Sequence, residues 1–254
     1  TNFIGKVGKD QFGYLLRDTL ADLSIGMDGL CFDDEVKTTL AFVKTFENGD
    51  RDFAFYRNPG ADMMLTEEEV DGEQIKNSRI FHFGTLSMTH EGVCKATEKA
   101  VNIAKENGVL ISVDPNLRIP LWKDLGIAKE KMEYGLSKCD VCKISEEEVE
   151  FLTGEKDIEK GAAILRGKFP VKLFQVTAGA EGSYAFYKDL VAYKPSYKLG
   201  GTIETTGAGD TFCGSILNGL LDRDIDNLTK EDLEQMLSFD NAAAYLVTTK
   251  KGAI

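Results

Sequence analysis

Apolar residues follow two periods along the chain, and each period predicts a different kind of element. Segment 109–113 is short and almost entirely apolar, which is typical of a strand buried on both faces. Segment 10–23 instead repeats apolar residues every three or four positions, at Phe12, Leu15, Leu16, Leu20 and Leu23. That spacing places them on one face and predicts an amphipathic helix packed against a core.

Strands and helices alternate from residue 80 to the end of the chain. The pattern predicts strands at 80–83, 109–113, 140–144 and 171–177. It predicts helices at 90–107, 125–136, 146–152, 158–168, 210–221 and 232–248, the last as one helix or two. A small hairpin of segments 183–187 and 190–194 interrupts the alternation. This order predicts a three-layer α/β/α fold with a mainly parallel central sheet, whose ligands bind at the carboxyl ends of the strands.

A second hairpin precedes this alternation. Segments 38–46 and 52–57 are rich in β-forming residues, and Glu47-Asn48-Gly49-Asp50 separates them. Asn-Gly tolerates the positive φ angles that a tight hairpin turn requires. Solvent-facing aromatic residues on such a hairpin would favour aggregation, so we expect them to cover a ligand or to pair with a second subunit in a homodimer.

Composition limits the cellular role. The 254 residues are enough for one large α/β domain, and we expect a single domain over 1–254. The formal net charge of −12 argues against nucleic acid and anionic membranes as partners. The apolar runs are too short to cross a membrane, and no basic segment followed by an apolar one opens the chain. Five scattered cysteines favour a reducing compartment, so we expect a cytoplasmic protein.

The pair Cys139 and Cys142 has the spacing of a redox or zinc motif. A redox motif needs a helix N-terminus and a zinc site needs a second pair of ligands, whereas this pair lies in a strand-like segment without one. We interpret both residues as structural.

The segment Gly207-Ala208-Gly209-Asp210 carries the strongest chemical signal. Three residues with almost no side chain allow backbone N–H groups to approach an anion, and the predicted helix that follows directs its positive end to the same point. Such an arrangement suits a phosphoryl group in transfer. Asp210 could accept the proton of an attacking hydroxyl group. Taken alone, the segment is equally compatible with a tight turn and a helix-capping aspartate.

Three further segments with polar residues follow predicted strands, and all four are expected at one edge of the sheet. They are Asp114-Pro115-Asn116-Leu117-Arg118, Ser145-Glu146-Glu147-Glu148 and Thr177-Ala178-Gly179-Ala180-Glu181-Gly182. A Walker A loop is excluded, because its nearest match, from Gly161 to Lys168, has the wrong spacing and no Ser or Thr after the lysine.

Together the four segments resemble the ribokinase-like, or PfkB, family of carbohydrate kinases. Segment 204–210, Glu-Thr-Thr-Gly-Ala-Gly-Asp, is similar to the family signature Asp-Thr-x-Gly-Ala-Gly-Asp, with Glu204 in place of the first aspartate. The resemblance extends over the whole chain. It implies a ribokinase-like fold with a small β-hairpin lid and an ATP-dependent kinase of a small sugar.

The resemblance also implies roles for individual residues. Asp210 would be the catalytic base and a contact of the sugar, with Gly207, Ala208 and Gly209 as the anion hole. Other positions match family motifs that contact the phosphates, the nucleotide or the phosphoryl acceptor: Asp114, Asn116, Arg118, Lys143, Thr177, Gly179 and Gly182. A charged loop after a strand and a plain turn between strands are the structural alternatives for these motifs.

Cations and the adenine are assigned by the same resemblance. Glu148 falls on the glutamate of the Asn-x-x-Glu motif that handles Mg²⁺ and phosphate, although Ser145 replaces the asparagine; a carboxylate can hold Mg²⁺ through water. The family often binds a monovalent cation such as K⁺ beside the anion hole, for which Glu204 and Thr206 are the candidate ligands. Asn241 lies where the last helices border the adenine, and tight helix packing is its alternative.

The substrate suggested by the resemblance is fructose, phosphorylated to fructose 6-phosphate. The hairpin leads into segment 55–62, Phe-Tyr-Arg-Asn-Pro-Gly-Ala-Asp, which resembles fructokinases in which a lid covers the sugar and the arginine, here Arg57, borders it. Alternatives are a kinase of 2-keto-3-deoxygluconate, ribose or another polyol, and a non-catalytic sugar- or nucleotide-binding protein on the same scaffold. The family's first strand and Gly-Gly loop precede the point at which this chain starts, so we expect a shortened chain or part of a longer protein.

Overall fold

The computed structural model describes residues 1–45 and 51–252, and it divides into two compact units. One unit contains Thr1–Val109 and Arg118–Ala128, and the other contains Leu110–Leu117 and Lys129–Ile254. The predicted turn at 47–50 lies outside the described residues. The expectation of a single domain stays a prediction.

The first unit begins with a βαβ arrangement. Strands β1 (Asn2–Gly8) and β2 (Gly26–Asp33) pair in parallel, and helix α1 (Gln11–Asp22) connects them. Asp10 caps α1, because its carboxylate accepts the backbone N–H groups of Phe12 and Gly13. The sequence pattern did not predict β2, since its two glycines and two aspartates disfavour a strand.

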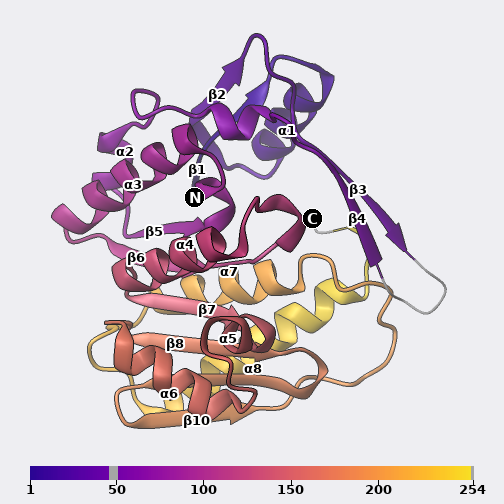
Figure 1. Cartoon of the computed structure of the whole chain (residues 1–254). Coiled ribbons are helices and arrows are strands. Elements are labelled where there is room, and N and C mark those ends of the chain that lie inside the picture. Colours follow the sequence, from indigo (N-terminus) through magenta and orange to yellow (C-terminus); the bar gives the residue numbers. More distant parts are fainter. Residues whose placement is uncertain (46–50, 253–254) are drawn as a thin grey trace. The chain divides into compact units, whose positions relative to one another are not determined.

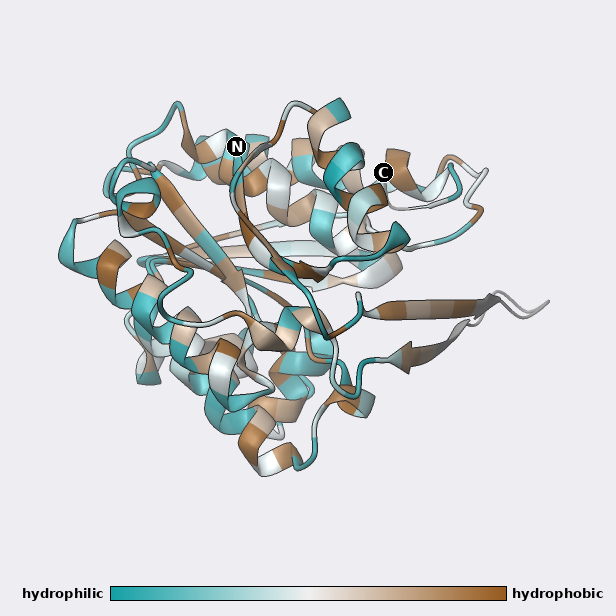
Figure 2. Ribbon diagram, turned by 90° about the horizontal axis from the view of Figure 1, so that it is seen from above, coloured by the Kyte–Doolittle hydropathy of each residue, from teal (hydrophilic) through white to brown (hydrophobic). Residues whose placement is uncertain are grey.

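Strands β3 (Leu40–Thr45) and β4 (Arg51–Tyr56) form the predicted antiparallel hairpin of the first unit. Both strands carry apolar residues, which are coloured brown in Figure 2. Phe42 and Tyr56 are 57% and 67% exposed, and their rings meet edge to face with centroids 5.5 Å apart. The hairpin therefore presents an aromatic pair to solvent.

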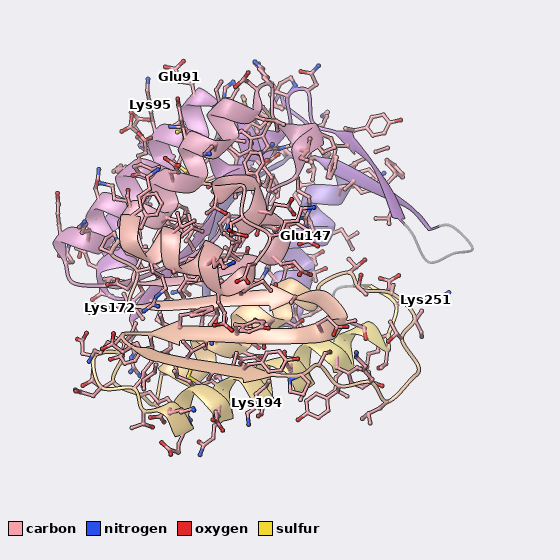
Figure 3. The ribbon with its side chains drawn as sticks, turned by 60° about the horizontal axis from the view of Figure 1, so that its bottom comes forward. Glu91, Lys95, Glu147, Lys172, Lys194 and Lys251 are labelled. Carbon is pink, nitrogen blue, oxygen red and sulfur yellow. The ribbon has the colours of Figure 1, made fainter. Side chains whose placement is uncertain are left out.

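The rest of the first unit is mostly helical. It contains α2 (Gly72–Lys76), β5 (Ile80–Gly84), α3 (Glu91–Glu106) and three short 3₁₀ turns, η1 (Ala61–Met64), η2 (Thr85–Met88) and η3 (Ile119–Leu121). Helix α3 buries an apolar stripe at Val93, Ala96, Ala100, Val101 and Ala104. On its exposed face Glu91 and Lys95 pair one turn apart, with 2.8 Å between Oε1 and Nζ (Figure 3). Helix α4 (Leu125–Lys138) begins in this unit and continues into the second.

The second unit is built on a mixed sheet. Strands β6 (Leu110–Asp114), β7 (Val141–Ser145) and β8 (Leu173–Ala178) are parallel, whereas β9 (Gly182–Tyr187) and β10 (Leu190–Lys194) run antiparallel as the predicted small hairpin. Their order across the unit is β10-β9-β8-β7-β6. The near-continuous apolar sequences of β6, β7 and β8 are explained by burial on both faces.

Helices cover this sheet on both faces, as predicted. Helices α5 (Glu146–Thr153) and α6 (Ile158–Lys168) lie on one face, and α7 (Ala208–Leu220) and α8 (Lys230–Thr248) lie together on the other (Figure 1). The final segment, predicted as one helix or two, is the single helix α8. The largest fully buried side chains of the unit come from the sheet and from the helices: Ile111, Met132, Leu136, Ile144, Leu173, Phe174, Tyr187, Phe212, Ile216, Leu233 and Leu237.

No described helix combines the length and the apolar character that crossing a membrane requires.

Candidate functional site

The predicted polar residues gather at the carboxyl ends of the parallel strands of the second unit. Asp114 is the last residue of β6, and Ser145 is the last of β7. Ser145 is in register with Thr177, near the end of β8. The strand ends thus bring three of the four predicted segments together at one edge, as expected of a parallel sheet.

A buried ion pair joins two of these strands. Lys143 Nζ on β7 donates to Asp114 Oδ2 on β6 at 3.0 Å, and the two side chains are only 8% and 6% exposed. Burial opposes the charge of Lys143, but Asp114, assisted by Glu148, outweighs that effect and the pKa of Lys143 is raised. The lysine therefore remains a cation throughout the neutral range.

The N-terminus of α7 meets this ammonium group. Gly207 occupies the N-cap with φ 78°, a left-handed conformation that glycine adopts without strain. A Cβ atom on Gly209 would lie 3.1 Å from Lys143 Nζ, so the small residue leaves room for the lysine. Helix dipole and ammonium group consequently place positive potential at the same point.

The start of α7 also lacks the side-chain cap that other helices have. Asp10, Asp71, His90, Ser145, Asp157 and Thr229 cap α1, α2, α3, α5, α6 and α8, whereas no side-chain hydrogen bond caps α7. Asp210 lies in its first turn and is exposed. This arrangement can accept an external anion, with a carboxylate beside it.

Glu148 fixes the loop after β6 to the start of α5. Its Oε2 accepts the N–H of Ser145 at 2.9 Å, and its Oε1 accepts the N–H of Leu117 at 2.5 Å. Ser145 Oγ accepts the N–H of Glu148 in return, which completes a capping box. Burial and the nearby Asp114 raise the pKa of Glu148, although the two backbone donors lower it. The serine in place of the family asparagine thus has a clear structural role.

The turn after β8 is shaped by two glycines. Gly182 has φ 125°, and a Cβ atom there would lie 2.2 Å from the carbonyl oxygen of Lys194, so only glycine fits. Gly179 has φ 49° and faces open space. Thr177 is half-buried, and its Oγ1 donates to the carbonyl of Ile144 at 3.4 Å. The turn leaves its outer edge accessible to a ligand.

Asn241 is buried on α8 and joins that helix to the β9–β10 hairpin. Its Oδ1 accepts from Ser183 Oγ at 2.9 Å. Its Nδ2 donates to the carbonyl oxygens of Lys194 and Pro195 at 3.1 and 3.3 Å. The amide group is thus engaged with protein atoms, and its predicted place beside the adenine stays a prediction.

Three further predicted residues lie at more open positions. Asn116 has φ 51° in the loop after β6, a conformation that asparagine tolerates better than most residues. Glu204 accepts the N–H of Gly252 through Oε1 at 2.9 Å and is half-buried, as is Thr206. Arg118 belongs to the first unit, where it is exposed at the start of η3.

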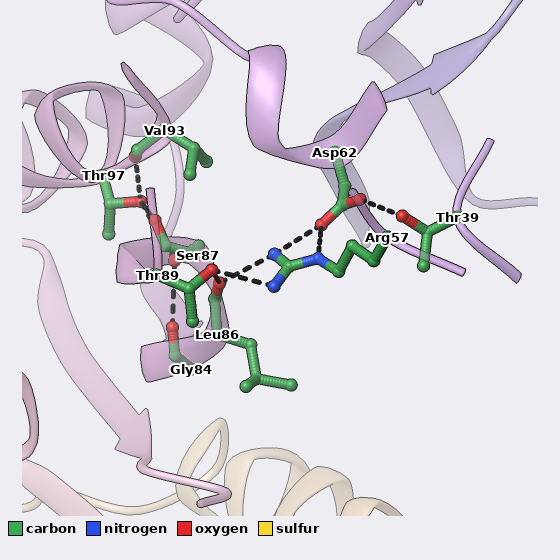
Figure 4. A network of polar contacts seen from close by, with 9 residues as sticks. All are labelled: Thr39, Arg57, Asp62, Gly84, Leu86, Ser87, Thr89, Val93 and Thr97. Carbon is green, nitrogen blue, oxygen red and sulfur yellow. Dashed lines mark hydrogen bonds and ion pairs between the residues drawn. The ribbon is translucent and has the colours of Figure 1, made fainter. Parts of the chain in front are cut away.

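Arg57 is the centre of a polar network in the first unit (Figure 4). Its Nε donates to Asp62 Oδ2 at 2.7 Å, Nη1 donates to Thr89 Oγ1 at 2.8 Å, and Nη2 donates to the carbonyl of Leu86 at 3.1 Å. Thr39 donates to the other oxygen of Asp62. The arginine anchors the base of the hairpin to the segment after β5, and its predicted contact with a sugar stays a prediction.

The cysteines take no part in a ligand cluster. None of the five is in a disulfide, and burial raises the pKa of the Cys142 thiol well above its usual range. Within residues 1–45 and 51–252, no three His, Cys, Asp or Glu side chains form a group that could hold a metal ion.

Sequence reasoning did not identify two buried polar residues near the site, Gln175 and Asp240. Gln175 on β8 is in register with Lys143 on one side and Ala185 on the other, so the three share one face of the sheet. Asp240 lies on α8, three residues after the buried Leu237 and one before Asn241. The helical spacing of Leu233, Leu237 and Asp240 is the signal that could have revealed a carboxylate on the buried face.

The ion pair leads to a prediction about stability. We expect Lys143→Met to lower the free energy of unfolding by about 3–5 kcal/mol, because Asp114 would remain buried without its counter-charge. Lys172→Met is the matched control, since Lys172 is partly exposed in its ion pair with Asp226, and we expect a loss within about 1 kcal/mol. Urea unfolding measures both. Equal losses in the two variants would contradict the importance of the buried pair.

The chain is similar to known sugar kinases. The model of the pfkB family of carbohydrate kinases matches residues 1–254. The chain is 40% identical over 252 residues to a probable fructokinase-2 of Arabidopsis thaliana, covering 99% of this chain and 76% of the relative.

Solved structures agree as well. A fructokinase from Vibrio cholerae O395, crystallised with fructose, ADP and calcium, superimposes with a TM-score of 0.89 at 30% identity, covering 99% of this chain and 80% of the other. A ribokinase II described as putative, from E. coli and crystallised with ATP and Mg²⁺, gives 0.86 at 29% identity, with 99% and 78% covered. The fold is therefore ribokinase-like, and the chain belongs to the pfkB family of carbohydrate kinases.

Proposed function

We propose that the protein is an ATP-dependent sugar kinase that transfers the γ-phosphoryl group of ATP to fructose, giving fructose 6-phosphate. The observation that carries the proposal is the N-terminus of α7, which has no side-chain cap and meets the buried Lys143 beside Asp210. The fructokinase names of the relatives support fructose as the acceptor.

The residues at the start of α7 would divide the chemical work. The carboxylate of Asp210 accepts the proton of the sugar hydroxyl group as its oxygen attacks phosphorus. The backbone at Gly207, Ala208 and Gly209, with the helix dipole, stabilises the negative charge on the transferring phosphoryl group. Lys143 adds a cation that Asp114 holds in place before the substrate arrives.

The loops after the other strands would hold the nucleotide. Thr177 and Gly179 lie at the open turn after β8, while Gly182 keeps that turn against Lys194. Asn116 and Asp114, at the end of β6, face the phosphates and the acceptor in this proposal. Asn241 holds the β9–β10 hairpin and would border the adenine in this proposal. The role of Arg118 at the phosphoryl group stays a prediction.

The carboxylates near Lys143 fit a divalent cation. The carboxyl groups of Asp114 and Glu148 both lie near this one ammonium group, and Asp114 raises the pKa of Glu148. Both oxygens of Glu148 already accept backbone N–H groups, so Glu148 would hold Mg²⁺ through water. When bound with ATP, Mg²⁺ would neutralise charge on the phosphates.

A monovalent cation such as K⁺ would lie near Glu204 and Thr206. Glu204 is half-buried and tied to Gly252, which orients one of its carboxylate oxygens. Replacement of K⁺ by Na⁺ in the assay described next tests this site, since turnover unchanged by the exchange argues against it.

The sugar is tested with a coupled assay of ADP release. We expect kcat/KM for fructose to exceed that for ribose and for 2-keto-3-deoxygluconate by at least about tenfold, because a pocket built for one polyol leaves polar groups unpaired with another. Equal values for ribose and fructose would reject fructose as the preferred acceptor. Sugar binding without ADP release would instead favour a non-catalytic binding protein.

The proposed base is tested by Asp210→Asn. Because only proton acceptance is removed, we expect kcat to fall by about 10²–10⁴-fold, while the Kd for ATP measured by calorimetry stays within a few-fold. Asp222→Asn, an exposed carboxylate after the same helix, is the control and should retain wild-type turnover. Unchanged turnover in Asp210→Asn would remove this residue from the mechanism.

The hairpin β3–β4 would form a homodimer through its exposed aromatic face. The exposed rings of Phe42 and Tyr56 offer an apolar surface to a second copy of the chain, and strand edges favour such association. We expect wild-type protein to sediment as a dimer, and the double variant Phe42→Ser/Tyr56→Ser to weaken dimerisation at least about tenfold. Leu246→Ser, an exposed leucine of α8, is the control. A monomeric wild type at micromolar concentration would contradict the dimer.

A further inference from the structure

Two buried side chains of the second unit have no role in the proposed mechanism. Asp240 on α8 is 1% exposed, and Gln175 on β8 is fully buried. Strand register places Gln175 in a row with Lys143, Ala185 and Ala192 on one face of the sheet. The Gln175 amide is close enough to Asp240 to lower the pKa of that carboxyl group. The two residues therefore meet between the sheet and α8.

All four polar atoms of this pair lack a geometrically acceptable hydrogen bond within the described part of the chain. They are Oδ1 and Oδ2 of Asp240 and Oε1 and Nε2 of Gln175. Burying such groups without partners is costly, and burying an unpaired charge costs more. The Gln175 amide can donate through Nε2 to one carboxylate oxygen of Asp240. The other oxygen of an ionised Asp240 would then have no hydrogen bond among the described residues.

The charged and titratable groups around Asp240 offset only part of the cost of a buried negative charge. Cys213 on α7 interacts with Asp240, and its pKa is raised to about 12, so this thiol is neutral at neutral pH. Arg223, after α7, exerts only a weaker attraction and is already bound to Asp232 at 3.0 Å. Burial dominates and raises the pKa of Asp240 to about 8.

We propose that Asp240 retains its proton in the folded protein, and that its carboxyl group and the Gln175 amide form a neutral buried pair that positions α8 beneath the nucleotide-binding edge. The carboxyl O–H can donate to Gln175 Oε1 while Nε2 donates to the other carboxyl oxygen. Small side-chain rotations thus satisfy all four atoms, which an ionised carboxylate would not allow.

The neutrality of the pair matters because of its neighbours. Gln175 is next to Lys143 in the strand register, and Lys143 is the cation that would face the phosphates. Asp240 immediately precedes Asn241, which holds the β9–β10 hairpin through Ser183 and Lys194. A negative charge on Asp240 would repel the negatively charged phosphates. It would also leave an unpaired charge buried under α8. This part of the inference rests on the proposed function.

The protonation state is tested by stability, independently of activity. Between the ordinary carboxyl pKa and about 8, the folded protein holds one more proton than the unfolded chain, so stability falls as pH rises. Relative to Asp240→Asn, which keeps the shape and the hydrogen bonds without the titration, we expect the unfolding equilibrium constant of wild type to rise about tenfold per pH unit from pH 5.5 to 7.5.

Urea unfolding at three pH values measures this difference. Asp222→Asn is the matched control, because its exposed carboxylate should leave the wild-type pH dependence unchanged. The same pH dependence in wild type and Asp240→Asn would overturn the inference, since it means that Asp240 titrates alike in both states. Should Asp240→Asn fold poorly, Gln175→Leu/Asp240→Leu removes both partners and is expected to show the same flattened dependence.

The positioning role is tested by kinetics. We expect Gln175→Leu, which leaves Asp240 without its partner, to raise the KM for ATP about tenfold or more with kcat within a few-fold of wild type. We expect the KM of wild type for ATP to rise between pH 7.5 and 9, where Asp240 loses its proton. Asp240→Asn should have the wild-type KM at pH 7 and show no such rise. An unchanged KM in Gln175→Leu would reject the positioning role. Complete absence of sugar kinase activity would count against the proposed function and leave the stability test decisive for the pair.

Discussion

The ammonium group of Lys143 is the fixed charge around which the candidate site is arranged. It lies between the carboxylate of Asp114 and the first turn of α7, in surroundings that exclude most water. A buried ion pair contributes little net stability on average, but removal of one partner leaves the other charge buried and unpaired, which is costly. Both residues are therefore needed together. Gly209 must be small because the lysine occupies the adjacent space, and Glu148 adds a second carboxylate that Asp114 makes harder to ionise. The residue types at Asp114, Gly209 and Glu148, which are far apart in the sequence, are thus all linked to the one cation of Lys143.

Helix capping separates the scaffold from the site. Side chains satisfy the first N–H groups of most helices, and Glu148 uses such a cap to fasten the loop after β6 to α5. At α7 a glycine occupies the capping position, and no side chain accepts the first N–H groups. In the first unit, the guanidinium group of Arg57 likewise has protein partners, Asp62 and Thr89, and it anchors the hairpin. Local satisfaction of polar groups therefore indicates which residues hold the fold and which can meet a ligand.

Most of the architecture could be predicted from the sequence because the apolar periods are strong. The strands β6, β7 and β8 and the helices between them have a clear pattern, whereas β2 contains glycine and aspartate and is held by pairing with β1. The strand-end motifs predicted that Asp114 and Thr177 lie at one edge of the sheet, where β6 and β8 end in the structure. The partners of Lys143, Asn241 and Arg57 depend on contacts between distant segments, which no local pattern contains. For Asp240, the helical spacing with Leu233 and Leu237 indicates the buried face of α8, but its neighbour Gln175 comes from a distant strand.

The thiol of Cys213 has a consequence for how motion near the site can be observed. Burial, followed by the nearby Asp114, raises the pKa of this thiol to about 12 although Lys143 lowers it, so almost none of it is thiolate at neutral pH. Alkylating reagents and peroxide should reach it only when α7 separates from the sheet. The modification rate of Cys213 therefore reports how often this part of the protein opens. A bound nucleotide that holds α7 in place would lower that rate.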